Sequence, residues 1–513
     1  MVARRTFLAG AAGLAGLTLT GWSDPRPGWS HPPRRRLPDG LFALGVASGD
    51  PRPDSVILWT RLAPDPLAPG GGMPPERVPV HWEVARDERF RRVVRAGTVM
   101  ALPDWAHSVH VNAPGLRPDT WYHYRFRVGD EVSPVGRTRT TPAPGRGGHL
   151  RFLFASCQDW QDGHWPAWAA APGDDPDLVV HLGDYIYEGG AAADVVRPHD
   201  GPEARTLEQY RNRYALYKGD PALQAAHAAC PWVVTWDDHE VENNYVGLVP
   251  QDPAEANAFP DRRAAAYRAW WEHQPVRLPP PSGPDLRIHR TVDWGRLVRF
   301  HVLDTRQHRD DQPCADVALV GDIGPDCPDR TAPGATVLGE RQERWLGRAL
   351  RRSHARWDVL ANQAVMTAMP LAGNLFNMDQ WDGYAAARSR LFDQLRAAGT
   401  ENPVVITGDI HAAGVADLVD DPEAEPVGTE LVGTSISSSF DPGLADVAEE
   451  LIRGLPHVRY ANVRQRGYVR CDVTGDELVA RYRFAESVTT PDAPVTTGTT
   501  WTITAGRPGA EGT

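Results

Sequence analysis

Short apolar runs separated by Gly, Pro and Asp fill residues 41–140. Alternating or continuous apolar positions predict strands there, at residues 56–60, 78–84, 108–111 and 121–128. Several short strands at such regular spacing are typical of a β-sandwich. We therefore expect an N-terminal β-sandwich domain over residues 40–141.

The pattern changes after a Pro- and Gly-rich boundary at residues 141–148. Continuous apolar runs predict buried strands at 150–156, 178–182, 231–236, 297–303, 357–361 and 403–407, with further strands at 431–438, 467–474 and 478–484. Helices are predicted between them, at 207–217, 260–273, 340–353 and 384–398. Strands that alternate with helices indicate a layered α/β domain, here over residues 150–490. We expect the tail, residues 499–513, to be frayed.

The first residues are typical of an export signal. Arg4 and Arg5 precede an apolar run that ends near Thr20, which is shorter than the roughly 20 apolar residues of a membrane span. A basic start before a short apolar run indicates secretion, and adjacent arginines indicate the twin-arginine route, which exports folded proteins. We expect residues 1–30 to be signal and linker, the twin-arginine export machinery to be a partner, and the mature protein to be extracellular or cell-wall associated. The plainer alternative is two chance arginines in an arginine-rich chain.

The charge balance narrows the class of partner. The chain has 54 basic and 66 acidic residues in 513, a formal net charge of −12. A nucleic-acid binder needs a basic face, so this balance argues against nucleic-acid-binding specificity. It does not exclude an anionic substrate, because a bound metal reverses the local field. We expect a monomer without a stable membrane anchor.

Five cysteines cannot all pair with one another. Cys314 and Cys327 bracket a Gly/Pro/Asp-rich loop, and in an exported protein such a pair indicates a disulfide. Cys157, Cys230 and Cys471 remain, and one further pair among them stays possible.

Polar residues directly follow four of the predicted strands, where α/β sheets place their functional side chains. They are Cys157; Asp184 and Tyr187; Asp237, Asp238, His239 and Asn244; and Asp409 and His411. Carboxylates and amides suit Ca²⁺, Mg²⁺ or Mn²⁺, imidazole suits iron or zinc, and thiolate with phenolate favours an oxidised ion such as Fe(III). A single Gly-Asp is often only a turn and a buried thiol is often only packing. Three adjacent polar residues after an apolar strand are costly to bury unless they are used. The four motifs together predict a dinuclear metal site.

These motifs resemble the PhoD family of alkaline phosphatases and phosphodiesterases. The matching segments are GDYIYE, TWDDHEVENN, LDTRQHRD, WDGY, GDIHAAG, ELVGTSISSS and RGYVRC, and the resemblance covers residues 41–484. It implies a metallophosphoesterase four-layer α/β/β/α sandwich preceded by an N-terminal β-sandwich, whose segment 116–126 is similar to the late strands of fibronectin type III-like modules. It implies an exported enzyme that hydrolyses phosphate esters by metal-activated hydroxide and releases phosphate.

The same resemblance implies an Fe(III) and Ca(II) centre, with one iron and one or two calcium ions. Carried over by motif, the iron ligands are Cys157, Asp184, Tyr187 and His411. Asp184 would also bridge to calcium, whose remaining ligands would be Asp237 or Asp238, Asn244 and Asp409. Which of the two adjacent aspartates binds metal stays open.

Two further side chains are candidate catalytic residues. His239 would protonate the leaving alkoxide, or would make only a hydrogen bond beside the site. Arg306 would bind a phosphate oxygen, or would form a structural ion pair.

Three other functions compete with this one. A phospholipase D-like phosphodiesterase would share the same ligands, so the motifs do not separate the two. A non-catalytic exported binding module predicts a degraded metal site, whereas every expected ligand type is present. A purple acid phosphatase fits poorly with Cys157 and the Asp-Asp-His motif.

Overall fold

The structure is a computed structural model of the chain, and it describes residues 37–513 except 315–317, 320–321, 372–373 and 421–423. The predicted signal and linker, residues 1–30, lie outside the described residues. Residues 38–513 form one unit. None of the helices in the described part of the chain has both the length and the hydropathy that a membrane span requires.

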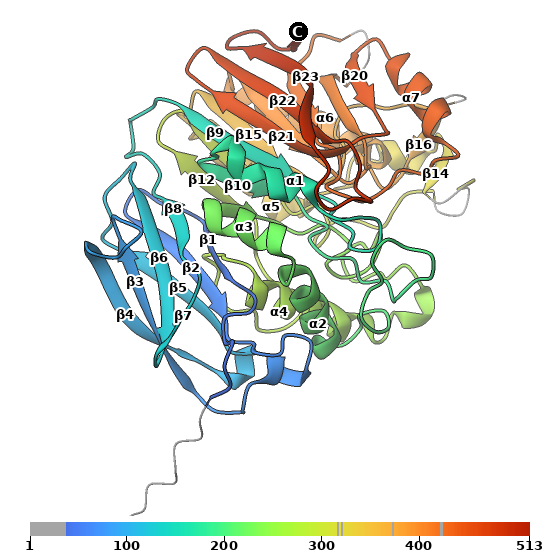
Figure 1. The fold of residues 1–513 in the computed structure, drawn as a ribbon. Coiled ribbons are helices and arrows are strands. Elements are labelled where there is room, and N and C mark those ends of the chain that lie inside the picture. The colour runs from blue at the N-terminus through green and yellow to red at the C-terminus, as the bar shows by residue number, and fades with distance from the viewer. Residues whose placement is uncertain (1–36, 315–317, 320–321, 372–373, 421–423) are drawn as a thin grey trace, which may run out of the picture. The chain divides into compact units, whose positions relative to one another are not determined.

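Two large sheets form the centre of the described fold (Figure 1). The first has ten strands in the order β24 (Glu511–Gly512), β23 (Val495–Thr504), β22 (Glu477–Ala485), β21 (Arg466–Val473), β9 (Leu150–Ala155), β10 (Leu178–His181), β11 (Trp232–Val234), β1 (Val46–Gly49), β2 (Ser55–Arg61) and β5 (Ser108–Pro114). The second has seven, in the order β12 (Arg290–Trp294), β13 (Val298–Val302), β15 (Trp357–Ala361), β17 (Pro403–Thr407), β19 (Gly428–Val432), β18 (Ala413–Leu418) and β20 (Val458–Asn462). The pairs β9–β10, β10–β11 and β15–β17 are parallel, so their carboxyl ends lie at the same edge of each sheet.

Successive side chains of the central strands point alternately into two different cores, one between the sheets and one under the helices. In β9, Phe152 and Phe154 lie in the core between the two sheets, and Phe152 meets Phe300 of β13 edge to face with ring centroids 5.2 Å apart. The intervening residues Leu153 and Ala155 lie in the core under the helices. Both faces of this strand are therefore buried, as its continuous apolar run predicts.

Helices cover the outer face of each sheet. Residues of α1 (Pro166–Ala170), α2 (Leu207–Lys218), α3 (Pro221–Ala229) and α4 (Phe259–His273) pack on the ten-stranded sheet. Residues of α5 (Gly339–Arg351) and α6 (Ala385–Ala398) pack on the seven-stranded sheet. Thr206 and Gln209 form a capping box at the start of α2. This arrangement confirms the predicted four-layer α/β/β/α order, while α1, α3 and a further helix, α7 (Ala445–Arg453), were not predicted.

The N-terminal strands divide between two sheets. β4 (Val93–Ala101), β3 (Val78–Ala85), β6 (Trp121–Val128), β7 (Glu131–Val132) and β8 (Gly136–Arg139) form a separate sheet. Ser48 Oγ of β1 donates to Thr138 Oγ1 of β8 at 2.9 Å, which joins this sheet to the other N-terminal strands. β1 pairs with β11 at Gly49 and Trp232, so β1, β2 and β5 continue the ten-stranded sheet. The domain limit at residue 141 therefore stays a prediction.

Two expectations about the C-terminal part are wrong. Residues 499–513 are not frayed, because β23 pairs along β22 and is itself paired by β24. Ile503 of β23 is buried in the core between the sheets, which holds this strand in place. The strand expected at 431–438 is β19, which begins at Gly428 and ends at Val432.

Candidate metal centre

The candidate ligands lie where two sheets meet at the carboxyl ends of their strands. Cys157, Asp184 and Asp237 follow β9, β10 and β11, and Asp409 follows β17 of the other sheet. A parallel bridge between Ser156 and Ser435 links the two sheets at this edge. A Cβ on Gly408 would lie 2.1 Å from Ser156 Oγ, so a glycine is required for the β17 turn to approach β9 this closely.

Several of these ligands have an unusual backbone conformation. Cys157, Asp184, Asn244, Asp409 and His411 have φ angles of 56°, 52°, 53°, 65° and 54°. This left-handed region is unfavourable for residues with a Cβ, and such residues gather at functional sites where the surrounding structure holds them. The backbone of the turns is thus arranged to point these side chains at one place.

One cluster combines sulfur, nitrogen, carboxylate and phenol donors. Ligand atoms of Cys157, Asp184 and His411 all lie within 4.8 Å of one another. Tyr187 Oη lies 3.1 Å from both Asp184 Oδ2 and His411 Nε2. The backbone carbonyl of Ser439 lies 2.9 Å from His411 Nδ1, which places the ring proton on Nδ1 and leaves the Nε2 lone pair facing the cluster. Burial lowers the pKa of His411 to about 4, so the ring is neutral, as a metal ligand must be.

Burial opposes ionisation of the other donors. It raises the pKa of the Cys157 thiol and the Tyr187 phenol well above their usual ranges, and the nearby charge of Asp184 adds to both shifts. A bound cation would reverse this effect, because a coordinated thiol or phenol loses its proton to the metal's field. Ionisation of these buried donors is therefore unfavourable without a cation and becomes favourable when a cation binds.

A second cluster is made of carboxylates. Ligand atoms of Asp237, Asp238 and Asp409 lie within 4.8 Å of one another, and Asp184, Asp238 and His239 form an overlapping group. Burial raises the pKa of Asp184 and Asp237 well above the usual range, and that of Asp409 to about 6. Asp238 is also buried, but Arg306 and His239 outweigh the effect of burial and lower its pKa to about 2.

Two carboxylate oxygens in these clusters are buried without a hydrogen-bond partner among the described residues, Asp184 Oδ1 and Asp238 Oδ1. A buried anionic oxygen without a partner is costly unless a cation binds it. The residues present therefore fit a pair of metal ions that share Asp184.

Arg306 lies beneath the carboxylates with its side chain fully buried. Its Nε lies 2.5 Å from Asp237 Oδ1 and its Nη1 lies 2.9 Å from Asp379 Oδ1. Its Nη2 lies 3.2 Å from Asp409 Oδ1 and 3.4 Å from Asp238 Oδ1. Burial opposes its charge, but these carboxylates raise its pKa well above the usual value. It is not among the described residues that line the cavity. The geometry fits the structural ion pair better than contact with a substrate.

His239 lies at the cavity with an acidic partner. Its Nδ1 lies 2.7 Å from Glu188 Oε2, and its ring stacks on Tyr187 with centroids 4.1 Å apart. Burial acts to lower the pKa of His239, but the carboxylates of Glu188, Asp238 and Asp184 together outweigh it and raise the pKa well above the usual value. The Glu188 contact uses Nδ1, so Nε2 is the nitrogen left for the cavity that His239 lines.

Four polar residues to which the sequence assigned no role complete the site. Glu240 belongs to the polar group of the TWDDHEVENN segment, and it accepts hydrogen bonds from the backbone N–H groups of Asp184, Tyr185 and Asp237. Gln380 donates to Asp409, and Asp322 accepts from the Asn244 side chain. Asp379 pairs with Arg306. The last three stand on loops with no apolar pattern nearby to mark them.

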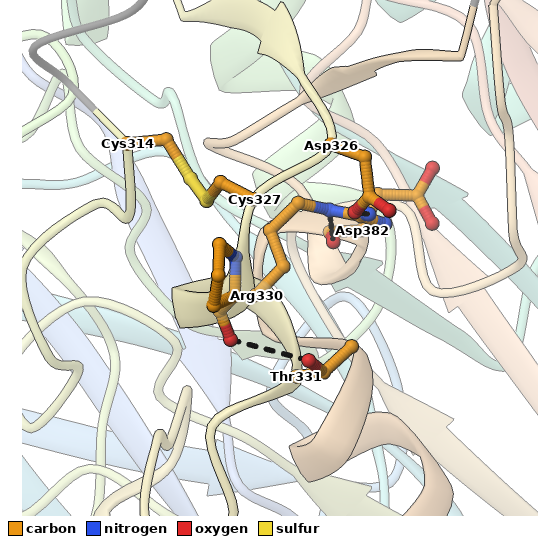
Figure 2. The surroundings of a disulfide bond; sticks show 7 residues. Cys314, Asp326, Cys327, Arg330, Thr331 and Asp382 are labelled. Carbon is orange, nitrogen blue, oxygen red and sulfur yellow. Dashed lines mark hydrogen bonds and ion pairs between the residues drawn. A yellow bond between two sulfur atoms is a disulfide. The ribbon is translucent and has the colours of Figure 1, made fainter.

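The predicted disulfide joins Cys314 and Cys327 (Figure 2). The loop that it closes carries Asp322 and leads into β14 (Ile323–Pro325), which pairs with β16 (Leu375–Asn377). Arg330 Nε donates to the backbone carbonyl of Asp382 at 2.9 Å, which anchors the segment that follows the disulfide. The other cysteines, Cys157, Cys230 and Cys471, are buried and free, so the further pair left open by the sequence does not form.

A cavity of about 480 Å³ opens above the carboxylates. Its floor includes Asp184, Asp238, Asn244, Asp409 and His411. The candidate ligands are thus reachable by a small phosphate ester.

The chain was compared with known proteins. Residues 152–482 match the PhoD-like phosphatase family, and residues 28–142 match the N-terminal domain of PhoD-like phosphatases. Alkaline phosphatase D of Bacillus subtilis is 46% identical over 519 residues, covering 96% of this chain and 86% of the relative. The solved structure of PhoD has a TM-score of 0.87 and 45% identity, with 92% of each chain covered. A purple acid phosphatase from yellow lupin seeds shares only the fold, with a TM-score of 0.55 and 12% identity over 90% of this chain and 73% of that chain. The predicted resemblance is confirmed: this chain belongs to the PhoD-like phosphatase family and is a phosphoesterase of the alkaline phosphatase D type.

Proposed function

We propose that this protein is an exported alkaline phosphatase and phosphodiesterase whose activity depends on an iron–calcium centre. The observation that carries the proposal is the buried group of carboxylates in which Asp184 Oδ1 and Asp238 Oδ1 have no hydrogen-bond partner among the described residues. Arg306 is the buried arginine among these carboxylates, and burying the remaining negative charge is costly unless cations bind there.

The donor types favour two different ions. Cys157, Asp184, Tyr187 and His411 would hold Fe(III), because thiolate and phenolate stabilise an oxidised ion. Asp184, Asn244 and Asp409 would hold Ca(II), with oxygen donors alone. The Asn244 amide nitrogen donates to Asp322, which leaves its side-chain oxygen for the cation.

The choice between the adjacent aspartates follows from their contacts. Asp238 lines the cavity, and its Oδ1 has no hydrogen-bond partner among the described residues and lies 3.4 Å from Arg306 Nη2, whereas Asp237 Oδ1 is held by Arg306 Nε at 2.5 Å. We therefore assign the calcium side to Asp238, and we assign to Asp237 and Arg306 the role of holding the cluster in place.

When bound, the ions supply Lewis-acid neutralisation of the phosphate charge and lower the pKa of water at the site. The protein's own contribution is the proton for the leaving group. Glu188 fixes the His239 ring through Nδ1, which leaves Nε2–H of the protonated ring to donate to the departing alkoxide oxygen.

The export proposal has two supports. Arg4 and Arg5 stand before the apolar run of the predicted signal. The Cys314–Cys327 disulfide forms in oxidising compartments, which lie outside the cytoplasm.

The proposal is tested by elemental analysis of natively exported protein purified without chelators, together with hydrolysis of 4-nitrophenyl phosphate and bis(4-nitrophenyl) phosphate. We expect one iron and one or two calcium ions per chain, and hydrolysis of both esters. Asp184→Asn, which keeps the side-chain shape, should lose metal and activity, whereas the exposed Asp293→Asn should change neither. Zinc or manganese alone would overturn the iron–calcium assignment, and an active, metal-loaded Asp184→Asn would refute the site.

A further inference from the structure

One side of the cavity is apolar, and the proposed chemistry does not use it. The floor consists of the carboxylates and histidines described above. The apolar wall of the cavity consists of side chains from four segments, namely Met369 and Leu371, Ile410, Phe440, and the α7 region with Leu444, Val447, Ala448, Leu451 and Ile452. Polar and apolar side chains therefore line the same space of about 480 Å³.

The α7 residues form a continuous stripe that the core leaves uncovered. Leu444, Val447, Ala448, Leu451 and Ile452 follow the spacing of one helix face, and all five line the cavity. Leu444 is 52% exposed and Val447 is 58% exposed, which is unusual for large apolar side chains on a helix with a polar opposite face. Among the residues of α7, only Ala445 is buried. The stripe thus faces the cavity rather than the interior of the protein.

The charge of the cavity limits what the wall can bind. Seven aspartates line it, namely Asp184, Asp238, Asp322, Asp379, Asp382, Asp409 and Asp441. No Arg or Lys stands among the described residues of the lining. A second anionic group on the substrate would find neither Arg nor Lys in this described lining, only the protonated imidazole of His239 among seven aspartates, whereas an uncharged apolar group would find the α7 stripe.

We propose that the α7 wall binds the uncharged apolar substituent of the phosphate ester, and that Leu444, Val447 and Leu451 determine specificity for esters of aliphatic or aromatic alcohols. The wall and the carboxylate floor line the same cavity, so a phosphate at the floor brings its ester substituent to the wall. Each methylene buried against such a surface gains about fourfold in binding. The inference rests on the proposed hydrolysis at the metal centre and names its substrate class.

The test uses ethyl, butyl and hexyl phosphate, assayed by release of inorganic phosphate below their critical micelle concentrations. The leaving alcohols of this series differ little in acidity, so kcat/KM reports binding of the chain. We expect a rise of at least tenfold from ethyl to hexyl phosphate in the wild type, mainly through KM. A terminal carboxylate on a chain of similar length should abolish the gain.

Matched variants locate the effect. The double variant Leu444→Ser with Val447→Ser should flatten the chain-length preference, with a loss of kcat/KM that grows from ethyl to hexyl phosphate. Val132→Ser, which alters a valine 43% exposed on β7 of the N-terminal sheet, should keep the wild-type preference. An unfolding midpoint equal to that of the wild type shows that each variant is folded.

Three results would overturn the inference while leaving the proposed function intact. They are equal kcat/KM for ethyl and hexyl phosphate in the wild type, a preference that survives the double variant, and a preference that emerges only above the critical micelle concentration. The last would mean that the stripe contacts a lipid aggregate rather than a single chain. No hydrolysis of any ester would refute the proposed function, and this inference with it.

Discussion

Replacing Glu240 by Gln should disconnect the two turns that carry the central aspartates. The Glu240 carboxylate is fully buried, and its Oε2 accepts from Asp184 N at 3.0 Å and from Asp237 N at 2.8 Å. Its Oε1 accepts from Tyr185 N at 2.8 Å. Burial raises the pKa of Glu240 to about 7, so the carboxylate is ionised in an alkaline assay. A Gln side chain has one acceptor oxygen, so at least one of these N–H groups would face an NH₂ group.

The size of the effect follows from these contacts. A hydrogen bond to a charged group contributes about 1.5–3 kcal/mol, and a buried donor left without a partner costs about 1–3 kcal/mol. We take about 3 kcal/mol as the loss when the Tyr185 N–H alone is affected. With an unfolding entropy of roughly 2 cal/mol/K per residue, this lowers the unfolding midpoint of a chain of this length by about 3 °C. If displacement of the Asp184 turn raises the activation free energy by half of this amount, kcat/KM falls by about tenfold, since about 1.4 kcal/mol is a factor of ten.

The assay combines hydrolysis of 4-nitrophenyl phosphate, metal content and thermal unfolding of the same preparations. Glu240→Gln should lose activity and metal together while remaining folded. Glu340→Gln, at an exposed position in a surface ion pair on α5, is the matched control and should behave as wild type. Wild-type kcat/KM and full metal content in Glu240→Gln would refute the view that this carboxylate holds the site.

Four other predictions can be tested separately. Cys157→Ser should lower iron content selectively and leave calcium, because the thiolate favours iron; unchanged iron would make this residue packing only. His239→Gln should slow ethyl phosphate by about a hundredfold and 4-nitrophenyl phosphate far less, because nitrophenolate leaves without a proton; equal losses would argue against a general acid. Replacing Arg4 and Arg5 by Lys should block export, and normal secretion would contradict the twin-arginine route. Burial lowers the pKa of His110 from 6.5 to about 4, so the folded state favours the neutral ring and stability should fall as the pH drops from 6.5 towards 4. Urea unfolding at pH 7 and pH 5 measures this loss of stability, and His110→Asn should make it smaller by about 1–2 kcal/mol. The same change in unfolding free energy between the two pH values for both proteins would contradict the prediction.

Local patterns in the sequence were enough to locate the strands and the ligands that follow them. The runs at β9, β10, β15 and β17 are mostly apolar, without strict alternation, because both faces of these strands are buried. A polar residue directly after such a run is conspicuous, and this contrast marked Cys157, Asp184, Asp237 and Asp409. The layer order followed because strands that alternate with helices have few stable arrangements.

The contacts between distant segments came only from the tertiary structure. Arg306 pairs with Asp237 and Asp379, which stand 69 and 73 positions away, and nothing local to any of the three indicates a partner. The α7 stripe was equally hidden, since it is uncovered by the core and lies on a short helix whose apolar residues resemble ordinary packing positions.

Sequence alone thus determined where the buried strands lie and which polar residues follow them, because a buried strand is marked by the apolar residues of a few neighbouring positions. Tertiary structure decided the rest. It placed Arg306 closer to Asp237 than to Asp238, extended the sheet through β1 and β23, and brought apolar side chains into the same cavity as the carboxylates. Each of these features depends on contacts between segments far apart in the chain. Such contacts cannot be predicted from the residues next to one another in the sequence, because their free energy depends on the tertiary environment.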